Sequence, residues 1–263
     1  MWRSFIFLFL LGLGFLGSLS AHADPFQEAR TALYAGQFDQ AHEQARALGT
    51  GAGLVLASEA LNAKLLLGQS ERPAKTAKTA MKLAKQALEM DAQNEAAQMQ
   101  YAVAYGFYGR HVSGFKAWRK KLPVKIKDEI EKSIAMNTSG ADEARNLALR
   151  GAWHLSVVMR AGVNRANSFY GANEAEGVRS FELAMCINPD DILIVANYTL
   201  MRYVLDPKAH QQWAQDNLKL IVDAKAHNAV ERQVQTRMQQ ILDSFDHPQD
   251  ADDTEKLAWN FLN

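Results

Sequence analysis

The stretch from Gly177 to Asp191, Gly-Val-Arg-Ser-Phe-Glu-Leu-Ala-Met-Cys-Ile-Asn-Pro-Asp-Asp, decides the fold of this 263-residue chain. Gly177, Phe181 and Ala184 follow one another at spacings of four and then three residues, which places them on one face of a helix. The Asn-Pro pair at 188–189 ends that helix, because proline cannot continue it. The stretch is therefore predicted to be the second helix of a helical hairpin.

The same spacing of small or apolar residues occurs twice earlier in the chain. One copy has Ala80, Ala84 and Ala87, and a fainter copy has Ile126, Ile130 and Ser133. Three copies at hairpin distance indicate a protein of stacked helical repeats. Such proteins typically use the surface of the stack to hold partners.

The composition supports a folded, uniformly helical protein. Hydrophobic residues make up 48% of the chain and charged residues 22%, which is enough apolar material for a substantial core. There are six prolines and no runs with the two-residue alternation of strands, so an all-α class is expected. Lys plus Arg and Asp plus Glu both number 29, so the net charge gives no reason to expect a nucleic-acid partner.

Residues 1–23 have the pattern of an export signal. Arg3 supplies a basic start, residues 5–19 form an apolar run, and Ala-His-Ala at 21–23 is a small-residue cleavage site. We expect cleavage after Ala23 and a soluble periplasmic protein. The apolar run is shorter than the roughly 20 residues of a membrane-spanning helix, although an uncleaved anchor is the alternative.

The mature chain is predicted to form tetratricopeptide-like hairpins stacked as a short solenoid. The expected helix pairs are 26–35 with 41–48, 54–67 with 77–90, 95–109 with 125–136, and 141–159 with 174–187. A fifth pair is expected to begin with 192–205, to turn at Asp206-Pro207 and to continue through 213–222. A last helix over 230–245 is expected to cap the open end of the stack. The repeat domain is thus predicted over 24–245, with an acidic C-terminal tail over 246–263.

Several motifs follow the pattern of a known family. They are Lys-Gln-Ala-Leu-Glu-Met-Asp at 85–91, Tyr101 to Gly106 with Gly109, the helix 126–136, Leu147-x-x-x-Gly151-x-Trp153, and Phe181 to Pro189. With these features, residues 75–245 resemble the bacterial tetratricopeptide-like relatives of the regulator of microtubule dynamics family. The resemblance implies a helical-repeat interaction protein and carries over no catalytic residue. The export signal argues against work on microtubules.

Motifs for catalysis or metal binding are incomplete. Ser113 and Lys116 have the Ser-x-x-Lys spacing of penicillin-recognising enzymes, but the accompanying Ser-Asp-Asn and Lys-Thr-Gly motifs are missing. His42-Glu43 begins a zinc-protease phrase, but Arg46 stands where the second histidine is needed. We therefore expect no enzyme, no metal and no cofactor.

A basic insert separates the two helices of the third pair. Seven cations and no acid occur between residues 110 and 127, at Arg110, Lys116, Arg119, Lys120, Lys121, Lys125 and Lys127. Phe115, Trp118 and Leu122 share a face, so the insert is predicted to contain a short basic amphipathic helix. Its cations, above all Lys116, Arg119, Lys120 and Lys121, either contact an anionic surface or stay solvated while the apolar face packs on the stack.

The helix over 141–159 is apolar almost all round, yet Asn146, Arg150 and His154 recur on it at every fourth residue. A polar ridge on a buried helix must find partners or face a cavity. The candidate partner-binding surface combines this ridge with side chains of neighbouring first helices: Tyr101, Tyr105, Asn146, Arg150, Trp153, His154, Asn197 and Arg202. The alternative is an internal hydrogen-bond network that holds this hairpin to its neighbours.

The function that follows from the sequence is an exported scaffold for a protein segment or another envelope component. The alternative is a periplasmic small-molecule carrier that works with a transporter, in which the long loops close the solenoid around a cavity. A scaffold predicts an open groove of mixed charge. A carrier predicts an enclosed pocket lined by Trp153, His154 and the tyrosines.

Overall fold

The computed structural model describes residues 24–136, 139–246 and 251–263. The expected export signal lies outside the described residues. Within them the chain is all-α, with no strand, and its helices pack in neighbouring pairs as a stacked helical solenoid that ends in a C-terminal helix. The predicted fold class is confirmed.

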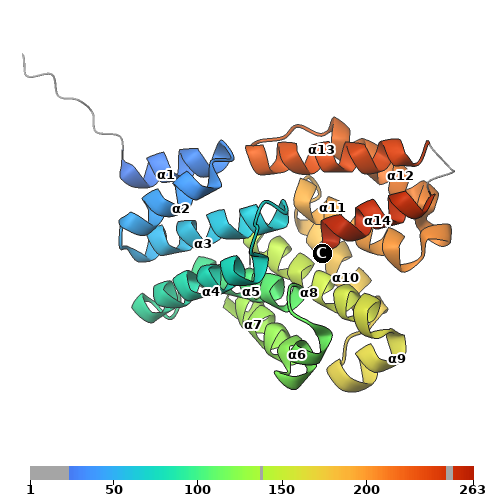
Figure 1. Cartoon of the computed structure of the whole chain (residues 1–263), viewed down its shortest axis with the longest axis horizontal. Helices are drawn as coiled ribbons and strands as arrows, with labels where there is room; N and C mark the ends of the chain where they lie inside the picture. The colour runs from blue at the N-terminus through green and yellow to red at the C-terminus, as the bar shows by residue number, and fades with distance from the viewer. Residues whose placement is uncertain (1–23, 137–138, 247–250) are drawn as a thin grey trace, which may run out of the picture.

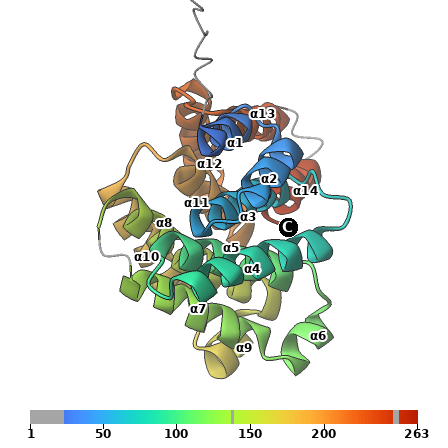
Figure 2. The same cartoon turned by 90° about the vertical axis from the view of Figure 1, so that its left-hand side faces the viewer.

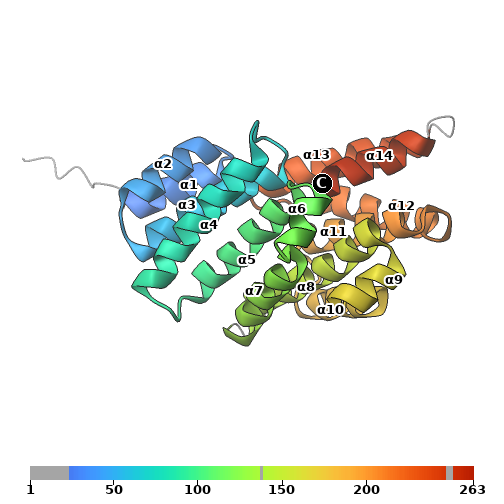
Figure 3. The ribbon, with the colours of Figure 1, turned by 60° about the horizontal axis from the view of Figure 1, so that its bottom comes forward.

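Ten helices form the successive hairpins of the described chain. They are α1 (Pro25–Tyr34), α2 (Phe38–Ala47), α3 (Gly51–Leu66), α4 (Pro73–Met90), α5 (Glu95–Arg110), α7 (Leu122–Met136), α8 (Gly140–Ala161), α10 (Glu174–Ile187), α11 (Ile192–Leu205) and α12 (Pro207–Asp223). Figure 3 shows α3, α4, α5, α7, α8 and α10 following one another side by side. The observed pairs agree with the predicted ones to within a few residues, and α12 begins at Pro207, in the predicted turn.

Capping residues lie at the N-termini of several helices, close to where the sequence predicts each helix to begin. Asn94, Asn173 and Asn228 each accept a hydrogen bond from the backbone N–H three residues on, at 2.9, 2.9 and 3.0 Å. Asp191, at the end of the stretch 177–191, accepts from two N–H groups of α11 and also lies 3.1 Å from Nε of Arg145 on α8. This one carboxylate therefore caps a helix and links neighbouring hairpins.

The repeated small residues form the contacts between helices. Ala80, Ala84 and Ala87 on α4 are fully buried, as are Phe181 and Ala184 on α10. In the fainter copy of the motif, on α7, Ile130 and Ser133 are also buried. The predicted register is confirmed for these positions, because each of them faces the interior of the stack.

Two inserts interrupt the hairpins. Between α5 and α7 lies α6 (Gly114–Arg119), and between α8 and α10 lie α9 (Val163–Arg165) and the π-helical turn η1 (Ala166–Tyr170). Lys121 separates α6 from α7 with a positive φ of 52°. Figures 1 and 2 place both inserts at the end of the molecule away from α1.

The first and last parts of the solenoid meet. Helix α13 (Ala229–Ser244) contacts α1, and the two lie next to each other in Figures 1 and 2. Nε2 of Gln69, in the α3–α4 connection, donates a 2.6 Å hydrogen bond to Oε1 of Gln233 on α13. The helix predicted to cap an open end therefore also closes the stack onto its beginning.

The segment 246–263, predicted to be an acidic tail, contains a further helix, α14 (Ala251–Leu262). It packs against α11 and α13, with Ala258 and Leu262 buried. Its apolar residues are spaced for a helix face, and the apolar surface of α11 and α13 gives that face a partner. Among the described residues, no helix combines the length and the hydropathy that crossing a membrane requires.

Candidate functional site

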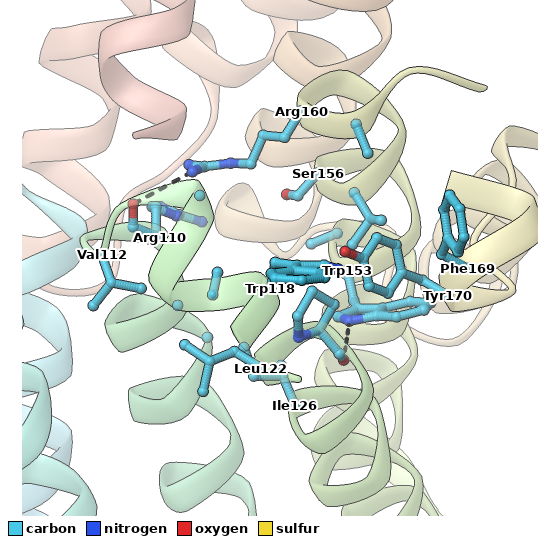
Figure 4. A pocket seen from close by; sticks show the side chains of 18 of the residues that line it. Arg110, Val112, Trp118, Leu122, Ile126, Trp153, Ser156, Arg160, Phe169 and Tyr170 are labelled. Carbon is cyan, nitrogen blue, oxygen red and sulfur yellow. Dashed lines mark hydrogen bonds between the residues drawn. The ribbon is translucent and has the colours of Figure 1, made fainter. Parts of the chain in front are cut away.

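A pocket of about 520 Å³ lies between α5, α7 and α8 and is covered by both inserts (Figure 4). Most of its lining is apolar or aromatic, from Val112, Trp118, Leu122, Ile126, Ile130, Leu149, Trp153, Phe169 and Tyr170. The volume is in the range of small-molecule sites. Three helices from two neighbouring hairpins supply the floor, whereas α6 and η1 supply side chains of the cover.

Three aromatic rings gather on one side of this pocket, from Trp118, Trp153 and Tyr170 (Figure 4). Trp153 is buried, and its Nε1 donates a 2.9 Å hydrogen bond to the carbonyl oxygen of Pro123. Nζ of Lys127 lies 5.3 Å from the Trp153 ring centroid, within cation–π distance. The position of Trp153 is therefore fixed by polar contacts, while its ring still lines the pocket.

The charged side chains of the pocket are all cationic. Arg110, Arg160 and Arg165 line it, and none of the described lining residues is an acid. Figure 4 shows Arg110 and Arg160 together at one end, where Arg160 donates a 3.3 Å hydrogen bond to the carbonyl oxygen of Arg110. Nη2 of Arg160 also donates a hydrogen bond to Oδ1 of Asn263, the residue that follows α14.

Arg110 is partly desolvated and has no counter-ion among the described residues. Its guanidinium lies 5.0 Å from the Phe107 ring centroid, and it makes no ion pair with a described carboxylate. Burial, and then the positive charge of Arg160, lower the pKa of Arg110 to about 10. Burial also lowers the pKa of Arg160. An anion between the two guanidinium groups would offset this cost.

Arg110 also borders a second, smaller pocket of about 280 Å³ at the closure of the solenoid. This pocket lies between the α3–α4 connection, α13 and α14, and His111 and Arg237 are among its lining residues. No acid is found among its described lining residues either. In a chain with equal numbers of acidic and basic residues, two adjoining pockets whose charged side chains, among the described residues, are arginines form a local concentration of positive charge.

The polar ridge predicted on α8 faces neighbouring helices. Asn146 is only 1% exposed, and its Oδ1 accepts a 2.8 Å hydrogen bond from Oγ of Ser133 on α7. Nε of Arg150 donates to Oγ of Ser180 on α10 at 3.0 Å. These contacts correspond to the internal network that was the alternative to a partner surface, and they leave Asn146 inaccessible to a partner.

His154 belongs to the same network. It is buried, and its Nδ1 accepts a 3.2 Å hydrogen bond from the backbone N–H of Asn173. Burial is the main reason that the pKa of His154 is lowered to about 4, and the nearby cations Lys127 and Arg150 add to the effect while Glu176 opposes it. The histidine is therefore uncharged in the folded protein at neutral pH.

Tyr101 and Tyr105 lie apart from the pocket between α5, α7 and α8. Their ring centroids are 6.0 Å apart on α5, and they line an open hollow with charged residues of α7, including Glu129 and Lys132. Nζ of Lys132 lies 2.9 Å from Oε1 of Glu129. This hollow has the mixed charge and open shape predicted for a scaffold groove.

The other two predicted partner residues lie on α11 and make local contacts. Nδ2 of Asn197 donates a 2.8 Å hydrogen bond to the carbonyl oxygen of Leu193 one turn earlier. Nη2 of Arg202 lies 2.8 Å from Nε2 of His210 on α12. The structure therefore divides the predicted site: Trp153 lines the pocket, the tyrosines line the hollow, and the remaining residues join helices or bond within one.

The predicted basic surface is on and just after α6. Lys116 is half-buried, with Nζ 5.9 Å from the Tyr108 ring centroid, whereas Arg119, Lys120 and Lys121 are exposed. The pocket residues that no sequence motif indicated as a binding site are Arg160, Arg165, Phe169 and Tyr170. For Arg165, Phe169 and Tyr170 the signal was the length of the connection after α8, which exceeds what a hairpin turn needs, whereas Arg160 lies within α8 and had no such signal.

No three His, Cys, Asp or Glu side chains of the described chain gather as a metal site. None of the curated proteins compared with the chain matches it. Residues 54–246, more than two thirds of the chain, match the family described as Regulator of microtubule dynamics protein 1-3. This match covers the region whose motifs predicted the family, and it includes every helix that forms the floor and the cover of the pocket between α5, α7 and α8. The chain therefore belongs to the regulator of microtubule dynamics family.

Proposed function

We propose that this protein is an exported carrier, built of tetratricopeptide-like hairpins, that binds a small amphiphile in the pocket between α5, α7 and α8. The ligand class is a molecule with an apolar body and one anionic group. The single observation that carries the proposal is an aromatic-lined pocket of about 520 Å³ whose charged lining residues are arginines without an acid among the described residues. The export signal predicted for residues 1–23 motivates the periplasmic location.

The apolar part of the pocket suits a flexible or ring-containing body. Leu122, Ile126 and Leu149 offer aliphatic surface, and Trp118 and Trp153 offer flat ring faces. Transfer of apolar surface from water into such a site contributes about 25 cal/mol per Å², so ligand size would set much of the affinity. This part of the pocket has few polar groups, of which Ser156 is one, so it selects for apolar character more than for a detailed shape.

The arginine end of the pocket suits a carboxylate or a phosphate. A guanidinium group can present two parallel N–H donors to such an anion. The half-buried Arg110 has lost part of its hydration and gained no counter-ion among the described residues, so an anionic group there stabilises the bound state more than it would at an exposed arginine. The anion would lie between α5 and α8, next to the contact of Arg160 with Asn263.

A fluorescent acyl carboxylate, such as 11-(dansylamino)undecanoic acid, tests both halves of the proposal. We expect saturable binding, and binding weaker by about tenfold or more for the methyl ester of the same probe, because the ester removes the charge. Arg110→Gln should weaken binding of the carboxylate probe and leave binding of the ester unchanged. Lys75→Gln, which removes an exposed charge from α4, is the matched control.

Filling the pocket provides a second arm of the experiment. Ala152→Phe and Ser156→Phe place a ring into the cavity from α8, and both should abolish binding of acid and ester alike. A thermal melt of each variant shows that it folds. Equal binding of both probes by the wild type and by folded, pocket-filled variants would place the probe elsewhere and contradict the proposal.

A second candidate function is the scaffold predicted from the sequence, and the observation that favours it is the open hollow at Tyr101 and Tyr105. A photo-crosslinking residue at position 105 should then capture one envelope protein during growth. The same residue at Tyr34, an exposed tyrosine on α1, is the control. Capture at both positions, or at neither, would argue against a partner in the hollow.

A further inference from the structure

Four large apolar side chains of the two inserts are exposed to solvent. Phe115 and Trp118 on α6 are 69% and 64% exposed, and Val163 and Phe169 on α9 and η1 are 62% and 71% exposed. The Phe115 and Trp118 ring centroids are 6.1 Å apart, so they form one apolar unit. The interpretation in which the apolar face of the basic insert packs on the stack holds for Leu122, which is buried, and not for these two rings.

The charges around these side chains are of one sign. The first insert carries Lys116, Arg119, Lys120 and Lys121, and the second carries Arg165. No acid occurs between residues 110 and 127 or between residues 160 and 173. Because the whole chain has as many acids as bases, this absence of acids is a property of the two inserts. We name these four apolar and five basic residues the insert surface.

The two halves of the insert surface border the same pocket. Trp118 of α6 and Phe169 of η1 both line it while remaining mostly exposed, so they lie at its rim. Figures 1 and 2 show both inserts at one end of the molecule. An apolar pocket thus opens within a surface of aromatic rings and cations.

We propose that the insert surface docks on a lipid bilayer that contains anionic headgroups. Aromatic rings favour the boundary between headgroups and acyl chains, and lysine and arginine favour anionic headgroups. A nucleic acid would use the cations but would give no reason for Val163 and Phe169 to be exposed beside them. The docked orientation turns the rim of the pocket toward the bilayer. The inference does not rest on the carrier function, since docking is measured without a pocket ligand.

Sedimentation with vesicles tests this inference, using protein recovered after export and with its N-terminus established by mass. Vesicles of equal parts phosphatidylglycerol and phosphatidylcholine should bind the protein at low salt, and vesicles of phosphatidylcholine alone should bind it at least about tenfold more weakly. High salt should weaken binding to the vesicles that contain phosphatidylglycerol, because salt screens the attraction between the basic side chains and the anionic headgroups.

Two sets of variants separate charge in general from this surface. Changing Lys116, Arg119, Lys120 and Lys121 together to Gln should lower the partition coefficient about tenfold or more. Changing Lys75, Lys82, Lys85 and Lys219 to Gln removes the same charge from exposed positions of α4 and α12 and should lower the partition coefficient less than about threefold. Equal losses in the two variants would show that net charge alone drives binding and would overturn the proposal.

The contribution of the aromatic side chains to vesicle binding is measured separately, by tryptophan fluorescence. Brominated lipids should quench the tryptophan fluorescence of the bound wild type, and Trp118→Leu should lose a large part of this quenching. Phe115→Ser with Phe169→Ser should reduce binding at high salt, where the apolar contacts dominate. Vesicle binding without quenching would exclude insertion, and binding to polyglutamate in place of vesicles would assign the surface to an acidic protein; either result overturns the proposal.

Discussion

The backbones of α8 and α10 meet at Gly151 and Gly177. A Cβ atom on Gly151 would lie 2.9 Å from the carbonyl oxygen of Gly177, and a Cβ on Gly177 would lie 2.5 Å from Cδ2 of Leu155. No side chain fits at either position unless its neighbours move, which explains why glycine stands within both helices. The close approach also brings Phe181 against Gly151, where it is fully buried.

We therefore expect Gly151→Ala and Gly177→Ala to lower the free energy of unfolding by about 1 to 3 kcal/mol each, although alanine is the better helix former. Chemical denaturation checks this. Gly106→Ala on α5 is the control, because the space that a methyl group would take there is open, and the change should be neutral or stabilise by up to about 1 kcal/mol. A similar increase in the free energy of unfolding for all three variants would contradict the close contact between α8 and α10.

Ala84 on α4 and Ala184 on α10 lie on the packing faces of two repeats, and both are fully buried. Leucine at either position overpacks the contact between helices, and we expect a loss of about 1 to 3 kcal/mol in unfolding free energy. Ala175→Leu, at an exposed site near the start of α10, should change the denaturation midpoint little. If the three variants have the same denaturation midpoint, the predicted positions of Ala84 and Ala184 on the packing faces of the repeats are wrong.

The 3.0 Å hydrogen bond from Arg150 to Ser180 predicts a modest structural role. Arg150→Gln should cost about 1 to 2 kcal/mol, and Ser180→Ala a similar amount, because each removes the same hydrogen bond. The double variant should cost less than the sum of the two, and this difference measures the coupling. A loss of about 3 to 5 kcal/mol for Arg150→Gln would instead indicate a buried carboxylate left without its partner.

His154 should make stability depend on pH. Its folded-state pKa of about 4 lies below the ordinary histidine value of 6.5, so the unfolded chain takes up a proton that the folded protein does not. The contribution to stability is fully present above pH 6.5 and decreases as the pH falls toward 4, by up to about 3 kcal/mol.

Thermal melts between about pH 7.5 and about pH 5 test this prediction. His154→Gln keeps an acceptor for the N–H of Asn173 and does not titrate, so its stability should fall less over this range. His111, whose pKa is also lowered by burial, is present in both proteins and cancels in the comparison. Parallel curves for variant and wild type would show that His154 titrates normally.

Residues 1–23 are predicted to be removed on export, with cleavage after Ala23 because Ala-His-Ala satisfies the small-residue rule. The intact mass of protein recovered from the periplasm is the measurement. Ala23→Arg should block processing, since a large charged residue does not fit the small-residue position. A stable membrane-bound product of full mass in the wild type would support the anchor alternative.

The sequence by itself determined the helices of the hairpins and their pairing, because these depend on local chemistry, but it did not indicate α14. Gly177, Phe181 and Ala184 lie on one face by their spacing alone, and Asn173 and Asp191 cap helices through backbone groups two or three residues away. Interactions of this range are visible in a linear sequence. The family could be predicted for the same reason, since its motifs follow the repeat contacts.

Only the tertiary structure decided which polar side chains are accessible and where a pocket forms. Asn146, Arg150 and His154 share a stripe in any helical arrangement, but their partners come from Ser133, Ser180 and Asn173 on other elements. The pocket likewise joins α6 and η1, two inserts that are far apart in the chain. Periodicity gives the direction of a side chain around its own helix, whereas the neighbour it meets depends on how the hairpins stack and close.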